Sequence, residues 1–188
     1  MIYPQLVLKK GKEKPVLQKH HWIFSGAVAK IPDAPNGALV AVQSFDGRQL
    51  GFAYFNRRSS ILARMVAFGE CDPIESVRGK IREAVLLRQA LIPSHTNAYR
   101  LINGEGDCLP GLIVDLYDRY LVIQISTLGM ELLKDTVVQE LMALINPLGV
   151  LEKSLLLPER ERDGDATIGG FHLLGHLPWR GEHAIAAF

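Results

Sequence analysis

The sequence has few cysteines, few acidic residues in its first third and no long hydrophobic run. Its two cysteines, Cys71 and Cys108, lack the paired spacing of a disulfide framework or a zinc site and are typical of the reducing cytosol. No apolar run approaches the ~20 residues of a membrane-spanning helix, and the first residues lack the apolar core of a signal peptide. We therefore expect a cytoplasmic protein with no membrane partner.

The charges are unevenly distributed, although the formal net charge is only +1. Residues 1–64 hold ten Lys and Arg but only three Asp and Glu, a balance of +7, whereas the remaining residues carry −6. This asymmetry indicates that the N-terminal third meets a polyanion. The alternative is a solvated basic face that has no partner.

Short apolar runs alternate with turn residues at the start of the chain. These runs predict strands at Leu6–Leu8, Trp22–Phe24, Ala38–Val42, Leu50–Phe55 and Ile61–Val66. Five strands within about 60 residues predict a small closed β-barrel, because closure leaves no strand edge exposed.

The second part of the chain mixes helices and strands. Asp72 as the cap and Pro73 at the first position predict a helix that Pro93 ends. Further strands are expected at Tyr99–Ile102, Ile113–Leu116, Tyr120–Ser126, Gly149–Glu152 and Gly169–His176. A helix is expected at Met130–Ile145, with Leu133, Val137, Leu141 and Leu144 facing inward, and a charged loop at Glu159–Asp165. The fold class is therefore α+β, a small β-barrel followed by a compact unit of strands, helix and strand.

Basic residues cluster in two segments that suit nucleic-acid phosphates. Lysines around a glycine place several ammonium groups on a backbone that can approach a phosphate closely, and a pair of arginines can fork onto phosphates. The candidate RNA-binding residues are Lys9, Lys10, Lys12, Lys14, Lys19, His20, His21, Arg57 and Arg58. Solvated surface cations are the alternative for each.

The residue after the two histidines admits two interpretations. An exposed Trp22 would stack on a base, whereas its apolar neighbours, Phe24 among them, favour a core position for both aromatic residues. His20 and His21 are adjacent in an expected strand and would point to opposite faces, so they are not expected to bind a metal together.

The glycine-rich segment 103–107 reads as a structural turn. Its Gly-x-Gly spacing is a poor dinucleotide fingerprint, because the Leu-Pro-Gly that follows prevents a helix. We expect a glycine at positive φ and an aspartate that caps backbone amides. An acid/base pair of Glu105 and Asp107 is the alternative.

Two segments resemble the ribosomal RNA large-subunit methyltransferases that make 5-methylcytosine. Residues 101–115 resemble the Arg-Leu-Ile-x-Gly-Glu-x-Asp-x-Leu-Pro-Gly segment between the RNA-binding and catalytic domains of that family. Residues 10–14 and 20–27 resemble the Lys-Gly-x-Glu-Lys and His-Pro-Trp-x-Phe-Ser-Gly-Ala motifs of its PUA domain, with His21 in place of the proline. The resemblance implies a PUA barrel that binds structured RNA, and S-adenosylmethionine as the cofactor of the full-length family.

The resemblance covers residues 5–157 and does not include the part of the family that catalyses methyl transfer. Residues 150–188 contain neither the cysteine nucleophile nor the glycine loop that a methyltransferase needs. We therefore expect four segments, namely a PUA-like barrel (1–68), a linker helix (69–97), a central α+β domain (98–157) and a tail (158–188) that is truncated before a methyltransferase domain.

The expected function is non-catalytic binding of structured RNA, ribosomal RNA in particular. No catalytic, cofactor-binding or metal-binding residue is expected in this chain, and a homodimer or partner contact is expected through residues 98–157. One alternative is an enzyme that uses Glu105, Asp107 and Asp115 as acid/base or metal-binding carboxylates. Another is a protein–protein adaptor.

Overall fold

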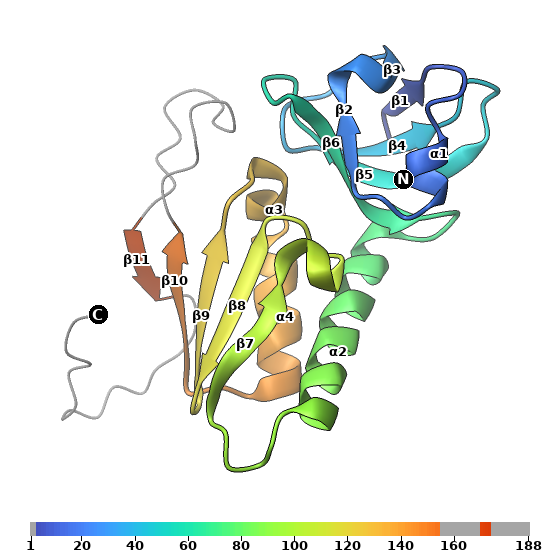
Figure 1. The fold of residues 1–188 in the computed structure, drawn as a ribbon. Helices are drawn as coiled ribbons and strands as arrows, with labels where there is room; N and C mark the ends of the chain where they lie inside the picture. Colours follow the sequence, from blue (N-terminus) through green and yellow to red (C-terminus); the bar gives the residue numbers. More distant parts are fainter. Residues whose placement is uncertain (1–2, 155–169, 174–188) are drawn as a thin grey trace.

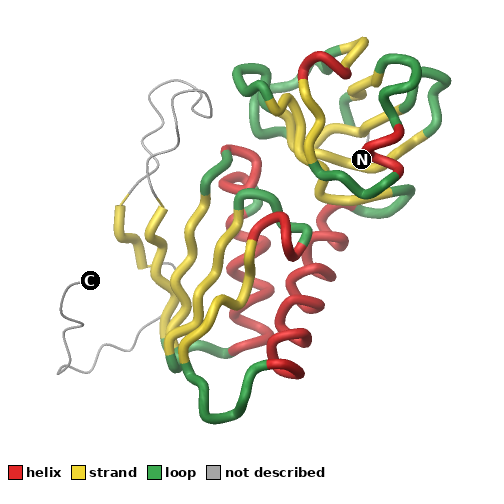
Figure 2. Tube along the Cα trace, in the orientation of Figure 1, coloured by secondary structure: helices red, strands yellow, loops and turns green. Residues whose placement is uncertain are grey.

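The computed structural model describes residues 3–154 and 170–173. These residues form a curled sheet and an open sheet, connected by the long helix α2 (Pro73–Leu91), as Figure 1 and Figure 2 show. The fold class is α+β, as predicted. Among the described helices, none combines the length and the apolar character needed to cross a membrane.

Six strands form the N-terminal sheet. They are β1 (Gln5–Leu8), β2 (Trp22–Phe24), β3 (Val28–Lys30), β4 (Leu39–Gln43), β5 (Gln49–Phe55) and β6 (Ile61–Phe68). The strand order is β2-β6-β5-β4-β1-β3, and the only parallel pair among these described strands is β1 with β4. The five predicted strands are confirmed, whereas β3 and the one-turn helix α1 (Lys14–Leu17) were not predicted.

The sheet curls around its own core into a half-barrel. Leu6, Leu8 and Phe55 are fully buried in that core. The edge strands β2 and β3 are connected by the 3-10 helix η1 (Ser25–Ala27), and no ladder joins them among the described residues. The predicted closure by hydrogen bonding is therefore wrong, because each edge strand has only three residues and a register break interrupts the pairing of β2 with β6.

Helix α2 begins and ends where the sequence predicts. The Oδ1 atom of Asp72 accepts hydrogen bonds from the backbone N–H groups of Ile74 and Glu75, at 2.9 and 3.0 Å. This cap satisfies two of the donors that a helix start leaves unpaired. On one face of the helix Val77 and Ile81 are fully buried, in the same apolar cluster as the second sheet.

Five strands form the second sheet. They are β7 (Ala98–Asn103), β8 (Leu112–Tyr117), β9 (Tyr120–Ile125), β10 (Gly149–Ser154) and β11 (Gly170–Leu173). The order is β11-β10-β9-β8-β7, and the pairing is antiparallel except between β9 and β10. The last expected strand is confirmed at residues 170–173, whereas the expected loop 159–165 lies outside the described residues.

The predicted helix 130–145 is divided into two. Helix α3 (Leu128–Leu132) begins at Thr127, whose side chain caps it, and α4 (Lys134–Ile145) follows after Leu133. Three of the four residues predicted to face inward are buried, but Leu144 is 37% exposed. Leu144 lies in the last turn of α4, one residue before the helix ends, where less of the core covers it. Helices α2 and α4 cover the same face of the sheet (Figure 1).

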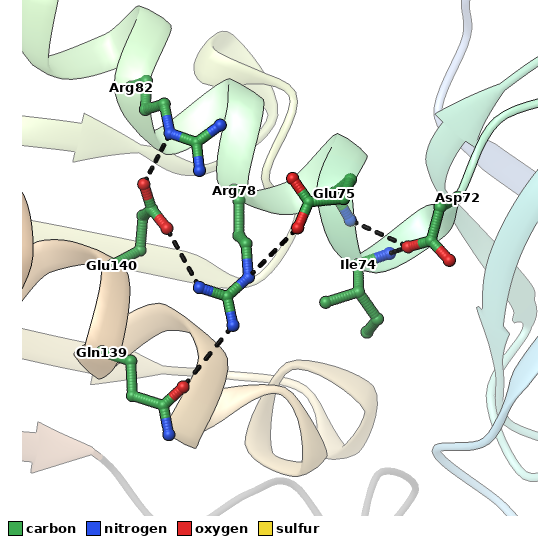
Figure 3. Close-up of polar contacts among 7 residues, drawn as sticks. All are labelled: Asp72, Ile74, Glu75, Arg78, Arg82, Gln139 and Glu140. Carbon is green, nitrogen blue, oxygen red and sulfur yellow. Dashed lines mark hydrogen bonds and ion pairs between the residues drawn. The ribbon is translucent and has the colours of Figure 1, made fainter.

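A charged clamp joins α2 to α4 (Figure 3). Glu140 of α4 is buried and accepts hydrogen bonds from Arg78 at 3.1 Å and from Arg82 at 2.7 Å. Arg78 also donates to Gln139 and lies 3.6 Å from the carboxylate of Glu75. A buried carboxylate is tolerated when it is paired and hydrogen-bonded, so two arginines from one helix fix the position of the other.

The two sheets are also joined directly, through a tyrosine. The hydroxyl of Tyr54 in β5 donates to the carbonyl oxygen of Pro110, at 2.9 Å, and Thr127 Oγ1 lies 3.1 Å from that hydroxyl. Tyr54 is 2% exposed, and a Cβ atom added at Gly129 in α3 would overlap its ring. The start of α3 is therefore packed tightly against the N-terminal sheet.

Candidate nucleic-acid interface

The first basic segment forms an exposed turn after β1. Gly11 adopts φ +79°, and the backbone N–H of Lys12 donates to the carbonyl oxygen of Lys9 at 3.0 Å. The Lys9 ammonium donates to the carbonyl oxygen of Gly26. The exposed side chains of Lys10, Lys12 and Lys14 make no hydrogen bond or ion pair within the described residues. These three lysines, the basic turn below, can meet an anion without giving up an existing contact.

Lys19 and the two histidines precede β2 and differ in exposure. The Lys19 ammonium lies 4.8 Å from the ring centroid of Phe68. His20 is exposed, and its Nδ1 accepts from the backbone N–H of Trp22 at 3.1 Å. His21 is half-buried, and its Nδ1–H donates to the carbonyl oxygen of Met65 at 2.8 Å.

The environment of His21 favours the neutral imidazole. Burial lowers its pKa, and this effect outweighs the opposing one of the hydrogen bond to Met65. A neutral, half-buried ring is a poor partner for a phosphate, so the nucleic-acid contacts proposed below do not use His21. The two histidines point to different environments, as expected for neighbours in an extended chain.

Strand β2 displays an exposed row of aromatic rings. Trp22 is 38% exposed and Phe24 is 49% exposed, so the core interpretation of these two residues is wrong. The physical reason is the alternation of side chains along the strand, since Ile23 points into the core and both of its neighbours therefore point to the outer face of the sheet. The ring of Trp22 meets those of His20 and Phe24 edge to face, with centroids 6.1 and 6.3 Å apart. We call these three rings the aromatic row.

Arg57 and Arg58 lie on the turn between β5 and β6. The backbone N–H of Arg57 donates to Asn36 Oδ1 at 2.8 Å, and its guanidinium donates to the carbonyl oxygen of Pro32 at 3.2 Å. The backbone N–H of Arg58 donates to Asn56 Oδ1 at 2.9 Å. These bonds fix the turn and leave both arginine side chains at the surface.

A cleft of about 340 Å³ lies where the aromatic row meets the second sheet. The indole Nε1–H of Trp22 donates to Oε1 of Glu105 at 3.0 Å. This bond connects the N-terminal unit, which is the curled sheet with its loops, to the second unit, which is the open sheet with its helices. Arg64 lies opposite Trp22 in the ladder of β2 and β6 and also lines the cleft. The lining from the second unit is Asn103, Gly104, Glu105, Gly111, Leu112, Ile113, Ser126 and Thr127. Both units are therefore needed to form this cleft.

Residues 103–107 form the predicted structural turn. Gly104, at φ +52°, begins the 3-10 helix η2 (Gly104–Asp107). Asp107 accepts from the backbone N–H of Asn103 at 2.6 Å, as expected for a capping aspartate. Its carboxylate also accepts hydrogen bonds from both Nη atoms of Arg88, at 2.6 and 2.7 Å. The arginine partner was not predicted, because it lies in α2 and is brought near by the fold.

The three carboxylates of the enzyme alternative each have a separate donor. Glu105 accepts from Trp22, Asp107 from Arg88, and Asp115 from Arg100 at 2.9 and 3.3 Å. The paired Asp115 raises the pKa of Arg100. The described residues contain no group of three or more His, Cys, Asp and Glu suited to a metal ion. The geometry gives the enzyme alternative no support.

The described residues do not fit S-adenosylmethionine. The glycine-rich loop after β7 leads through η2 into strand β8, and no α-helix begins there. A helix N-terminus after the glycine loop is the feature that such nucleotide sites use to approach their ligand.

The sequence and the fold are similar to those of known methyltransferases. Residues 6–68 match the sequence model of the PUA-like domain. The chain is 35% identical, over 179 residues and 93% of its length, to a ribosomal RNA large subunit methyltransferase I of Vibrio cholerae. It is 31% identical, over 180 residues and 94% of its length, to one of Salmonella arizonae. The chain spans 44% of the length of each of these relatives.

Two solved structures have the same fold at low sequence identity. One, from Streptococcus mutans, is assigned as a SAM-dependent methyltransferase; the TM-score is 0.68 at 20% identity, over 82% of this chain and 41% of that chain. The other is assigned as a methyltransferase and was solved with SAH; the TM-score is 0.70 at 19% identity, over 82% and 40% of the two chains. The chain therefore contains a PUA-like domain and is homologous, over most of its length, to ribosomal RNA large subunit methyltransferases I.

Proposed function

We propose that this chain binds structured RNA, ribosomal RNA in particular, through the basic turn and the aromatic row. Two findings support the proposal: the PUA-like domain spans the basic third of the chain, and the relatives are named as ribosomal RNA methyltransferases. In this proposal the described residues recognise RNA and carry no catalysis of their own.

The observation that carries the proposal is the state of the basic turn. Lys10, Lys12 and Lys14 are exposed, and within the described residues their ammonium groups contact no carboxylate. Gly11 keeps the backbone between them open, because nothing lies within 4 Å of the position that its Cβ would occupy. Cations in this state release counterions when they meet phosphates, which is the main source of affinity in nucleic-acid binding.

The second unit is the less suitable surface for a polyanion. Residues 98–154 contain four Lys and Arg against eight Asp and Glu. The cations Arg100 and Lys134 in this unit are already paired with carboxylates. We propose that phosphates contact the N-terminal unit and that the second unit contributes only where it faces the cleft at Trp22.

A protein contact through residues 98–157 stays a prediction. Exposed apolar side chains in this range include Tyr117, Leu132 and Leu144. Leu86 and Leu91, on α2, are more exposed than any of these three, at 63% and 70%. The exposed apolar side chains are thus spread over several elements, and we favour RNA binding over the adaptor alternative.

Charge reversal on the basic turn tests the proposal. The full chain carrying K10E, K12E and K14E should bind a ribosomal RNA hairpin at least tenfold more weakly than the wild type in a filter-binding assay. The matched pair is K12E and R119E, since both reverse one exposed cation and change the net charge equally. K12E should weaken binding and R119E should not. Equal loss in both variants would show that only net charge matters, and undiminished binding by the triple variant would refute the proposal.

A further inference from the structure

We propose that the cleft between Trp22 and Glu105 binds one unpaired nucleobase that carries an exocyclic amine, which means adenine, cytosine or guanine. This inference rests on the proposed RNA binding and names the part of the RNA that the second unit recognises. It assigns a role to the cleft, which the basic turn does not explain.

The indole of Trp22 offers a stacking surface. Its neighbours His20 and Phe24 meet it with interplanar angles of 89° and 84°, so neither ring takes a parallel stacking position. The hydrogen bond from Nε1 to Glu105 fixes the orientation of the indole at the cleft before a ligand arrives. A base that stacks on a preoriented aromatic side chain loses little binding energy to ordering of the protein.

The carboxylate of Glu105 can select for the amine. Its Oε1 atom accepts from Trp22, while Oε2 receives no hydrogen bond from the described residues. A carboxylate oxygen is an acceptor only, so it pairs best with an exocyclic N–H₂ group, whereas the one edge donor of uracil, N3–H, is flanked by two carbonyl oxygens that repel a carboxylate. Asn103, which also lines the cleft, has an exposed side-chain amide that can donate and accept on the same edge.

The size and lining of the cleft fit one base better than a duplex. A volume of about 340 Å³ is at the lower end of the range for small-ligand sites. Ile113 adds a half-buried apolar side chain for the base, and Arg64 supplies a cation beside Trp22. Lys19 and His20 precede Trp22 in the sequence and lie at the surface. The phosphates of the nucleotide whose base enters the cleft would remain in solvent near these two residues.

Tryptophan fluorescence tests the inference directly. The chain has two tryptophans, Trp22 and Trp179, so W179F leaves Trp22 as the only reporter and W22F leaves the other. The probes are RNA hairpins with one common stem and a loop of only A, only C or only U, together with the blunt duplex of that stem. Stacking should quench Trp22 in a saturable manner with the A and C loops. The duplex should not quench it.

Base selection provides the second readout. The U-loop hairpin should bind roughly tenfold more weakly than the C-loop hairpin, because the two carbonyl oxygens beside the N3–H of uracil repel Glu105, and a tenfold loss is that of one hydrogen bond to a charged group. In E105Q the side chain can still accept from Trp22 but now presents an N–H₂ group of its own, so the preference for C over U should disappear. Retention of the full preference in E105Q would contradict the role of Glu105.

The outcomes separate this inference from the proposed function. If filter binding shows salt-sensitive association with every hairpin but Trp22 in W179F is not quenched, the base site is wrong and RNA binding stands. Quenching by the blunt duplex equal to that by the loops would also overturn the base site. If no RNA binds at all, both proposals fail.

Discussion

Two neighbouring histidines, His20 and His21, precede β2 and differ in burial. His20 lies at the surface beside Trp22, whereas His21 is half-buried and donates to the carbonyl oxygen of Met65. The sequence Lys-His-His-Trp gives no sign of this difference, because it depends on the pairing of β2 with β6. A single hydrogen bond and a half-buried ring thus decide which of the two histidines is available to a phosphate.

The burial of His21 predicts a loss of stability in acid. Its pKa is lowered in the folded state, so below about pH 6.5 the unfolded chain takes up a proton more readily than the folded chain. Its contribution to the free energy of unfolding should therefore be complete above that pH and fall as the pH decreases towards the folded pKa. H21Q keeps an N–H donor for Met65 and should flatten this decline in urea titrations between pH 5 and pH 8.

The neighbouring histidine provides the control for that measurement. H20Q removes the exposed imidazole one residue away and should leave the decline as steep as in the wild type. An equally flattened profile in H20Q, or an unchanged profile in H21Q, would show that the acid sensitivity arises elsewhere.

The position of helix α3 depends on the absence of a side chain at Gly129. Its Gly129 lies against the ring of Tyr54, which is buried and hydrogen-bonded to Pro110. The short helix can approach the N-terminal sheet because this position has no Cβ. The contact lies between the two units, so it bears on the cleft as well as on stability.

Two glycine-to-alanine substitutions in helices should have opposite effects. G129A forces Tyr54 or α3 to move and should lower the free energy of unfolding by about 1–3 kcal/mol. G79A, in α2, meets no atom within 4 Å and should raise it by up to about 1 kcal/mol, because alanine is the better helix former. Denaturant titration of both variants measures the two changes in the free energy of unfolding. An unchanged free energy of unfolding in G129A would contradict the tight contact between α3 and Tyr54.

The elements with clear periodicity could be predicted from the sequence. The helix after Asp72 and the strands with apolar runs have signals that lie within a few residues of one another. Strand β3 was missed because Val28–Lys30 contains one buried residue and two exposed ones, and so has no apolar run. The break at Leu133 was missed because the apolar spacing continues through it.

The candidate site was predictable only in part. The basic turn follows from composition, since lysines are exposed in almost any fold. Trp22 donates a hydrogen bond to Glu105, which lies 83 positions away in the sequence. No local sequence pattern predicts this contact or the exposure of Trp22. The same holds for the pairing of Arg88 with Asp107, in which Arg88 donates to both oxygens of the carboxylate.

At the scale of the molecule, the charge division coincides with the division into units. The basic residues belong to the curled sheet and its loops, whereas the second sheet is acidic and its charges are largely paired. A polyanion is therefore attracted to one end of the molecule and repelled from the other. In the proposed complex, this arrangement would orient the RNA with its phosphates at the basic turn and a base at the cleft.

Salt dependence of RNA binding is the most direct test of this account. If about four cations of the N-terminal unit contact phosphates, the logarithm of the affinity of the full chain for a ribosomal RNA hairpin should fall with the logarithm of the salt concentration, at a slope near −3. In the variant with K10E, K12E and K14E the slope should become much shallower, because three of those contacts are lost. A slope near zero in the wild type, or one that the triple variant leaves unchanged, would contradict the assignment of RNA binding to this surface.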